Sequence, residues 1–154
     1  MLVMMQRLCS IILYICSVYG FYQIFMGLHL FGKIPALEIQ SSRVNRFAVV
    51  ICAKNEEKVI RQLLDSLRKQ KYPTNAFDIF VIADNCTDQT ASVAASCGAK
   101  VFERFNPLQK GKGYALNWFF DRFAHEQAHV YDACIIFDAD NLADAGFLDA
   151  MNRQ

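Results

Sequence analysis

Blocks of apolar residues alternate with polar clusters along most of the chain. Continuous apolar runs of strand length occupy residues 47–53, 79–83 and 133–137, and each leads directly into polar or charged residues. Runs of this kind are typical of strands that are buried on both faces of a sheet. Between them, apolar residues recur every three or four positions, which is the spacing of an amphipathic helix.

This alternation predicts strands over 47–53, 78–83, 100–102 and 133–137. Four helices accompany these strands. Asn55 caps the first, which closes before Pro73, and the second covers 88–97 and ends at Gly98. The third begins after Gly113, and Asp144 caps the fourth. Strand–helix alternation with wholly apolar strands indicates parallel strands joined by crossover connections. The predicted fold class is therefore α/β, a Rossmann-like parallel sheet flanked by helices.

Three of the predicted strands end in polar clusters. These clusters are residues 54–56, 84–88 and 138–141. In open α/β sheets the ligand lies beyond the carboxyl ends of the strands, so the clusters are expected to converge at one edge. Chance would scatter such residues along the chain, and their placement therefore favours a binding site at that edge.

The N-terminal stretch predicts a different element. No charged residue occurs between Leu8 and Phe31, and a helix of this length reaches across a hydrocarbon core of about 30 Å. We predict a transmembrane helix within residues 1–32, a linker over 33–46 and a globular domain over 47–154. A cleavable signal peptide has a shorter apolar region and small residues at its cut site, and a soluble core helix need not be apolar on all sides.

The charges that flank this helix predict its orientation. Arg7 precedes it, and Lys33, Arg43 and Arg46 follow it, so the positive-inside rule places the globular part in the cytoplasm. The formal net charge of the whole chain is only +1, which gives no indication of a nucleic-acid partner.

The cysteines and histidines carry no clear site. None of the 6 cysteines forms a Cys-x-x-Cys pair, and Cys52 and Cys134 lie in apolar runs. This pattern predicts small buried hydrophobic residues in a reducing compartment rather than disulfides or a zinc site. His125 and His129 have a spacing that suits a metal on one helix, but without a third ligand nearby they are predicted to be surface residues.

The candidate chemistry lies in the acids that follow the last strand. Asp138 and Asp140 are separated by one small residue, and two such close carboxylates are costly to desolvate unless a cation lies between them. A divalent cation such as Mg²⁺ meets this need and shares its oxygen ligands with substrate phosphates. Taken alone, the tripeptide also fits a solvated turn after a strand. The convergence of the strand ends favours the metal site.

Basic residues near the same edge suit a diphosphate. Arg104, Lys110 and Lys112 surround two glycines that allow a close approach of the backbone to a ligand. For the lysines, the alternative is a solvated helix start. Asp84 could accept hydrogen bonds from a base or ribose edge, and its alternative is a turn or cap before the next helix. The familiar Gly-x-Gly-x-x-Gly and Walker spacings are absent, and no Ser-His or Cys-His catalytic arrangement can be assigned.

Four motifs resemble the family 2 glycosyltransferases over residues 47–151. They are Val-Val-Ile-Cys-Ala-Lys-Asn-Glu at 49–56, Ile-Ala-Asp-Asn-Cys-Thr-Asp-Gln-Thr at 82–90, Gly-Lys-Gly-Tyr-Ala-Leu-Asn at 111–117, and Phe-Asp-Ala-Asp at 137–140. The resemblance implies the nucleotide-sugar-binding half of a GT-A fold. The preceding membrane helix is similar to that of members that build polysaccharides, such as cellulose-synthase-like and poly-N-acetylglucosamine-synthase-like enzymes.

The resemblance also implies roles for single residues. Ala53, Asn55 and Glu56 would line the nucleotide pocket, Asp84 would contact the base, and Asp88 belongs to the same motif. Lys112 would lie near the diphosphate. Asp138 would contact the ribose, or the metal through water, and Asp140 would ligate Mg²⁺ or Mn²⁺ directly. The metal would stabilise the departing nucleoside diphosphate.

The implied reaction is transfer of a sugar, with inversion, from a uridine-diphosphate or similar donor to a glycan or lipid acceptor. In the family, the carboxylate base and the acceptor-binding motifs follow the paired acids by a substantial stretch, and this chain stops at Gln154. The expectation is a truncated or partial chain that carries the donor and metal site but lacks the base, and that has little activity alone. The alternatives are a membrane-anchored binding module without catalysis and a haloacid-dehalogenase-type phosphatase, whose first Asp would be a nucleophile.

Overall fold

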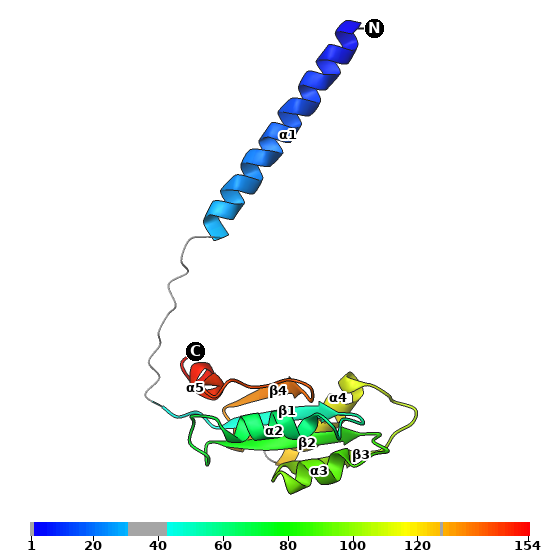
Figure 1. Ribbon diagram of the computed structural model, residues 1–154, viewed down its shortest axis with the longest axis vertical. Coiled ribbons are helices and arrows are strands. Elements are labelled where there is room, and N and C mark those ends of the chain that lie inside the picture. Colours follow the sequence, from blue (N-terminus) through cyan, green and yellow to red (C-terminus); the bar gives the residue numbers. More distant parts are fainter. Residues whose placement is uncertain (1, 31–42, 127) are drawn as a thin grey trace. The chain divides into compact units, whose positions relative to one another are not determined.

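The computed structural model describes residues 2–30, 43–126 and 128–154 (Figure 1). The chain divides into two compact units, residues 1–37 and 38–154. The first unit contains α1 (Leu2–Leu30). The second contains, in chain order, β1 (Phe47–Ala53), α2 (Ile60–Arg68), β2 (Phe77–Asp84), α3 (Thr90–Ser96), β3 (Lys100–Arg104), α4 (Lys112–Glu126), the short 3₁₀ helix η1 (Ala128–Val130), β4 (Ala133–Asp138) and α5 (Phe147–Asn152).

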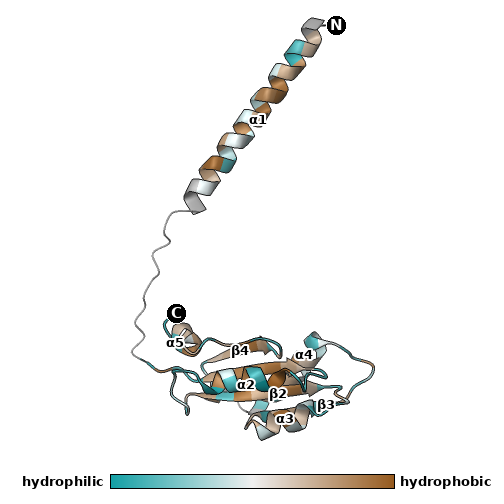
Figure 2. Ribbon diagram, viewed as in Figure 1, coloured by the Kyte–Doolittle hydropathy of each residue, from teal (hydrophilic) through white to brown (hydrophobic). Residues whose placement is uncertain are grey.

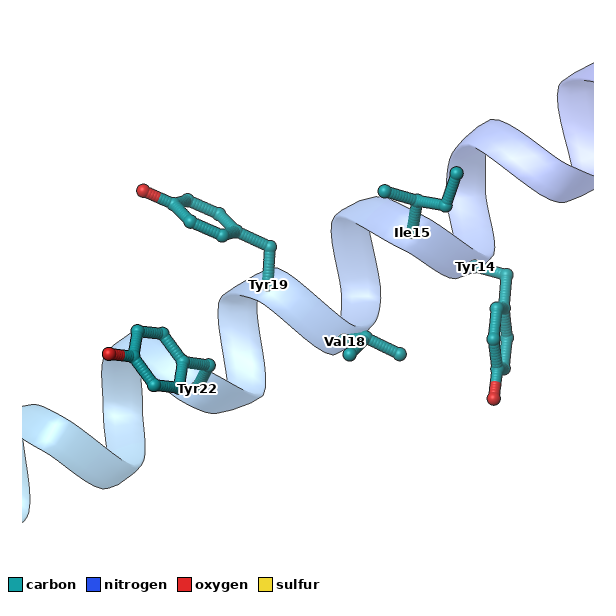
Figure 3. A pocket seen from close by; sticks show the side chains of 5 residues that line it. All are labelled: Tyr14, Ile15, Val18, Tyr19 and Tyr22. Atoms are coloured by element: carbon teal, nitrogen blue, oxygen red, sulfur yellow. The ribbon is translucent and has the colours of Figure 1, made fainter.

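The first unit is a helix with the length and composition of a membrane span. Its segment Met4–Gly27 has 24 residues and a mean hydropathy of 1.7. Hydrophobic residues occupy successive turns of α1 (Figure 2), and the consecutive exposed residues 11–15, all hydrophobic, cover every side of the helix. Tyr14, Val18 and Tyr19 lie along one face of it (Figure 3). A helix that is apolar on all sides suits a lipid environment. Residues 33–42 of the predicted linker lie outside the described residues.

The second unit is built on a parallel sheet, as predicted. The 4-stranded sheet has the order β3-β2-β1-β4, and all three strand pairs are parallel. β1 is the central strand between β2 and β4, and it is buried along almost its whole length. The carboxyl ends of β1, β2 and β4 therefore meet at one edge, which confirms the predicted α/β class.

Helices cover both faces of the sheet (Figures 1 and 2). On one face, α2 and α5 pack against the sheet through fully buried leucines such as Leu63 and Leu148, and α3 lies against β2 and β3. On the other face, α4 packs against β1 and β2 through Phe119 and Phe123. Each buried side chain of this size contributes about 1.5–3 kcal/mol by leaving water. The two layers hold the strand ends, and with them the polar clusters, in fixed positions.

The α4 layer is an aromatic cluster centred on Phe80. The Phe80 ring lies 5.4–6.2 Å, between centroids, from the rings of Phe102, Phe119, Phe123 and Tyr131. Edge-to-face contacts of this kind add about 0.5–1.5 kcal/mol per pair beyond the burial of area. This cluster fixes α4, whose first residue is Lys112, against the sheet.

Several boundaries differ from the prediction. α2 begins at Ile60 rather than after Asn55, because Asn55 adopts a left-handed backbone conformation with φ of 57° that a helix cannot contain. The prediction that Asn55 caps this helix is therefore wrong. β3 extends to Arg104, two residues further than predicted. Gly98, with φ of 72°, ends α3 as expected, because glycine adopts this conformation without strain.

The last strand is also less buried than predicted. β4 is an edge strand, and only Ile135 and Phe137 along it are buried, while Cys134 and Ile136 are exposed. The expectations of a strand buried on both faces and of a buried Cys134 are wrong, because β4 has a covered face and an uncovered one. All 6 cysteines are free.

Asp78 ties the strands together at the edge opposite the polar clusters. It accepts hydrogen bonds from Tyr131 at 2.7 Å and Arg46 at 2.9 Å, and it pairs with Lys100 at 3.0 Å. Burial acts to raise the pKa of Asp78, but these three donors outweigh it and hold the pKa below its ordinary value of 3.8. Burial, reinforced by the Asp78 carboxylate, raises the pKa of the Tyr131 hydroxyl to about 12.

We expect Tyr131→Phe to lower the free energy of unfolding at pH 7 by about 1.5–3 kcal/mol, the usual contribution of a hydrogen bond to a charged group. Because the pKa of Asp78 is lower in the folded state, its stabilisation is present above pH 4 and is lost as the pH falls through the folded pKa. The difference between the two proteins should therefore shrink in acid. Urea denaturation at pH 7 and pH 3 measures it, with the exposed Tyr114→Phe as control. An unchanged difference at pH 3 would contradict this account.

Candidate functional site

The loops that follow β1 and β2 are joined by reciprocal hydrogen bonds. The Asn55 side-chain oxygen accepts from the backbone N–H of Thr87 at 2.8 Å. The Glu57 carboxylate accepts from the backbone N–H of Gln89 at 2.9 Å, and the Asp88 carboxylate accepts from the backbone N–H of Glu57 at 3.2 Å. The predicted convergence of these two strand ends is thus a direct contact.

Asp88 organises the start of α3. Its Oδ1 accepts hydrogen bonds from the Thr90 backbone N–H at 3.0 Å and hydroxyl at 2.5 Å, and its Oδ2 accepts from Glu57. Desolvation acts to raise the pKa of Asp88, but these hydrogen bonds outweigh it and hold the pKa below its ordinary value of 3.8. Both oxygens of Asp88 thus have partners in the protein, and its contact with a substrate stays a prediction.

The other residues predicted beside Asn55 differ in exposure. Ala53 is buried at the end of β1, and its carbonyl lies 3.5 Å from the Cys86 sulfur. Glu56 is half-buried, and its backbone N–H donates to the Thr90 hydroxyl at 2.8 Å. The backbone of residues 53–56 therefore forms part of the wall between the β1 and β2 ends.

Asp84 ends β2 in a buried ion pair. Its Oδ1 lies 2.6 Å from Nη1 of Arg104, and each side chain is 3% exposed. The two residues are direct cross-strand partners on β2 and β3. Arg104 also donates to the carbonyl of Gln109 at 3.0 Å and to its side-chain oxygen at 3.2 Å. The pair thus connects the β2 end with the loop that leads to α4.

The paired acids lie at the end of β4. Asp138 is the last residue of the strand, and a turn follows in which the backbone N–H of Asn141 donates to the Asp138 carbonyl at 3.2 Å. Ala139 is buried, so the strand presents its methyl group to the core. Asp138 and Asp140 on either side of it are exposed. The alternation of the strand therefore directs the two carboxylates into solvent.

Lys112, the first residue of α4, contacts Asp138. Its ammonium group hydrogen-bonds to Asp138 Oδ1, and both side chains are partly exposed. Beside it lies an open cavity of about 460 Å³, lined by Lys110, Gly111, Gly113, Tyr114 and Asn117. The end of β4 and the start of α4 are thus joined by an ion pair, and the cavity lies on the α4 side of it.

The donor set of this site suits a hexacoordinate divalent cation. Within residues 2–30, 43–126 and 128–154, no group of three or more His, Cys, Asp or Glu side chains is arranged to hold a metal. Mg²⁺, however, keeps several waters and needs only one or two carboxylates beside substrate phosphates. Asp138 and Asp140 provide that number, and their exposure leaves room for water and phosphate.

Cys52 lies on β1 next to these acids, in register with Asp138. Burial raises the pKa of its thiol to about 11, and the Asp84 carboxylate raises it further in the same direction. The thiol is therefore protonated at neutral pH, which excludes a role as a nucleophile there. His125 and His129 are exposed, as predicted, and they belong to different helices, α4 and η1.

The hydrogen bonds of Arg104, Thr87, Thr90 and Gln109 were not predicted from the sequence. The sequence pattern predicts Arg104 among the basic residues that face a diphosphate, whereas the structure places it in the interior beside Asp84. Its conformation depends on the register of β2 against β3, which the residues of a single strand do not reveal.

Comparison with known proteins identifies the family. Residues 48–152 match the family model described as Glycosyl transferase family 2. The beta-monoglucosyldiacylglycerol synthase of Nostoc sp. (strain PCC 7120) is 32% identical over 120 residues, which cover 70% of this chain and 25% of that protein.

Two solved structures share the GT-A-type fold. S. aureus TarS 1–349 matches with a TM-score of 0.55 and 26% identity over 69% of this chain and 31% of that chain. Mannosyltransferase PcManGT from Pyrobaculum calidifontis, in complex with GDP-Man and Mn²⁺, matches with a TM-score of 0.57 and 24% identity over 73% of this chain and 32% of that chain. The chain spans a quarter to a third of the length of these proteins. Because the family model matches well over half of its residues, the chain belongs to glycosyl transferase family 2.

Proposed function

We propose that the second unit binds the nucleotide-sugar donor of a glycosyltransferase reaction, with a uridine-diphosphate sugar as the first candidate. One observation carries the proposal: Lys112 contacts Asp138, two residues before the exposed Asp140, and the chain neighbours of Lys112 line an open cavity. An ammonium group suits phosphate oxygens, and two carboxylates suit a divalent cation that shares those oxygens. A diphosphate satisfies both requirements at once.

Each side chain then has a role in binding. Asp84 accepts a hydrogen bond from the base, and Ala53, Asn55 and Glu56 form the neighbouring wall of the pocket. Lys112 would neutralise the diphosphate, since its ammonium group suits phosphate oxygens as well as the Asp138 carboxylate that it contacts in the unbound chain. When bound, Mg²⁺ or Mn²⁺ would stabilise the charge of the departing nucleoside diphosphate.

Asp140 would hold the cation directly, and Asp138 would contact the ribose or the cation through water. Both carboxylates are exposed, and the turn between them is fixed by the buried Ala139. This anchoring positions the two oxygens before the ligand arrives, which lowers the entropic cost of binding.

Related proteins support the donor and suggest the acceptor. TarS has been crystallised with UDP-GlcNAc, and the Nostoc relative is named for a glucosylated diacylglycerol. We infer that the acceptor is a glycan or a lipid and that the transfer inverts the anomeric centre. No residue of this chain is assigned as the general base that would activate the acceptor.

Two other functions fit the geometry less well. A haloacid-dehalogenase-type phosphatase carries its nucleophilic Asp after the first strand, whereas Asp138 ends the fourth strand in the chain. A binding module without catalysis would use the same donor site, and transfer of the sugar to an acceptor is what would distinguish the two functions. The α1 helix would anchor either protein in a membrane, with the second unit on the cytoplasmic side.

We expect the full chain in detergent micelles to bind UDP-GlcNAc or UDP-glucose more tightly with Mn²⁺ than with EDTA. Lys112→Ala should weaken this binding by about tenfold, because a charge-assisted bond to a phosphate is lost. Isothermal titration calorimetry measures both effects. Lys71→Ala, an exposed lysine that follows α2, is the matched control. Absence of any uridine-nucleotide binding in Mn²⁺ would overturn the proposal.

A further inference from the structure

The Asp84–Arg104 pair is more elaborate than a simple ion pair. Both side chains are almost fully buried, and Arg104 bonds at the same time to Asp84 and twice to Gln109. Its Nε is buried and has no hydrogen-bond partner among the described residues. Burying two charges is costly, and a pair of apolar residues would stabilise the fold as well or better. This cost calls for a role other than stability.

The pair leaves the Asp84 carboxylate with one free oxygen. In the described part of the chain, two hydrogen bonds reach this carboxylate, and both end on Oδ1. Arg104 donates one at 2.6 Å, and Asn85 donates the other at 3.0 Å. Oδ2 receives none from the described residues. A carboxylate is an acceptor only, so a ligand meets a single acceptor oxygen here.

A single acceptor oxygen distinguishes between bases. Uracil presents one ring N–H flanked by two carbonyl oxygens, and one acceptor satisfies it. Guanine presents a ring N–H and an amino group side by side, which together require two acceptors. A guanine at Asp84 could not pair its two donors with both carboxylate oxygens, because Oδ1 already accepts from Arg104 and Asn85.

We propose that Arg104 is a positioning residue that makes the donor site selective for uracil over guanine. It does so by occupying Oδ1 of Asp84 and fixing the rotation of the carboxylate, while its bonds to Gln109 hold the guanidinium itself in place. This inference rests on the proposed function, since it concerns the base of the same nucleotide.

The bonds to Gln109 are what a lysine cannot reproduce. A planar guanidinium offers several donors in a fixed arrangement, whereas an ammonium group is a point charge on a flexible stem. Arg104→Lys therefore keeps the charge beside Asp84 but loses the rigid connection to the loop. The carboxylate is then free to turn and to offer both oxygens to a base.

The test compares UDP with GDP by isothermal titration calorimetry on the full chain in detergent micelles with Mn²⁺. The unchanged chain is expected to bind UDP at least about tenfold more tightly than GDP, the effect of one unpaired buried donor. Arg104→Lys should reduce that ratio to about two or less, and Gln109→Ala, a change of an exposed residue, should reduce it partially. Arg153→Lys, in the exposed pair with Asp149, is the control.

The outcomes separate the two proposals. If neither nucleotide binds the unchanged chain, the proposed function fails. If UDP binds but GDP binds equally well, or if the ratio is the same in the unchanged chain and in both variants, the role of Arg104 is overturned while the donor site stands. A merely structural role would lower the thermal midpoint and both affinities together and leave the ratio unchanged. Gln109→Ala supplies the decisive ratio if Arg104→Lys does not fold.

Discussion

Asp140→Asn is expected to abolish the Mn²⁺-dependent part of donor binding, with a loss of affinity of at least about 100-fold. Substitution of outer-shell partners alone typically costs 10–100-fold in metal affinity, so loss of a direct ligand should cost no less. Asparagine has nearly the same size as aspartate, and the turn after β4 is anchored by the buried Ala139 rather than by this exposed side chain. The fold should therefore persist.

Calorimetric titration of a uridine-diphosphate sugar with Mn²⁺ and with EDTA measures this effect. The affinity of Asp140→Asn in Mn²⁺ should equal that of the unchanged chain in EDTA. Asp121→Asn, an exposed acid on α4 that accepts a hydrogen bond from Asn117, is the matched control and should bind like the unchanged chain. Equally tight binding of Asp140→Asn in Mn²⁺ would show that this acid holds no metal.

The largest effect on stability is expected from Phe119→Ala, a loss of about 3–5 kcal/mol in the free energy of unfolding. Phe119 is 1% exposed, and its ring contacts those of Phe80, Phe102, Phe120 and Phe123 within 5.2–5.7 Å between centroids. Truncation leaves a cavity at the centre of the α4 layer. The rigid rings around it cannot fill this cavity without losing their own contacts.

The single tryptophan of the chain, Trp118, packs against the same cluster and reports its unfolding by fluorescence during urea denaturation. Phe120→Ala is the control, since Phe120 is only half-buried and should cost distinctly less. Donor affinity should fall as well in Phe119→Ala, because α4 positions Lys112. A loss of stability below about 1 kcal/mol would mean that α4 is not fixed by this cluster.

The sheet and its binding edge could be predicted because they depend on local patterns. Apolar runs of strand length separated by helical spacing require parallel strands, and parallel strands bring their carboxyl ends together. The contact between Asn55 and Thr87 realises that expectation. The edge position of β4 could not be predicted in this way. The run from Ala133 to Phe137 is as continuously apolar as that of the central strand β1. The spacing of apolar residues therefore does not reveal which strand lies at the edge of the sheet.

The details of the site depended on backbone conformation and register. Asn55 has the residue type of a helix cap, yet its left-handed conformation places it in the preceding loop, where its side chain bonds to the next strand end. Arg104 has the residue type of a phosphate ligand, yet the pairing of β2 with β3 turns it toward Asp84. In both cases the residue type suits two roles, and contact with a segment distant in the sequence decides which role the side chain takes.

The two edges of the sheet differ in how they would receive another strand. β3 carries the exposed Lys100 and Glu103, and charges of this kind discourage pairing between molecules. β4 carries no charge before Asp138, and its uncovered face shows Cys134 and Ile136 to solvent. The sheet is therefore protected from growth at one side only. A further strand, from this polypeptide or another, would therefore pair more easily with β4 than with β3. It would then lie next to the acids that would hold the metal.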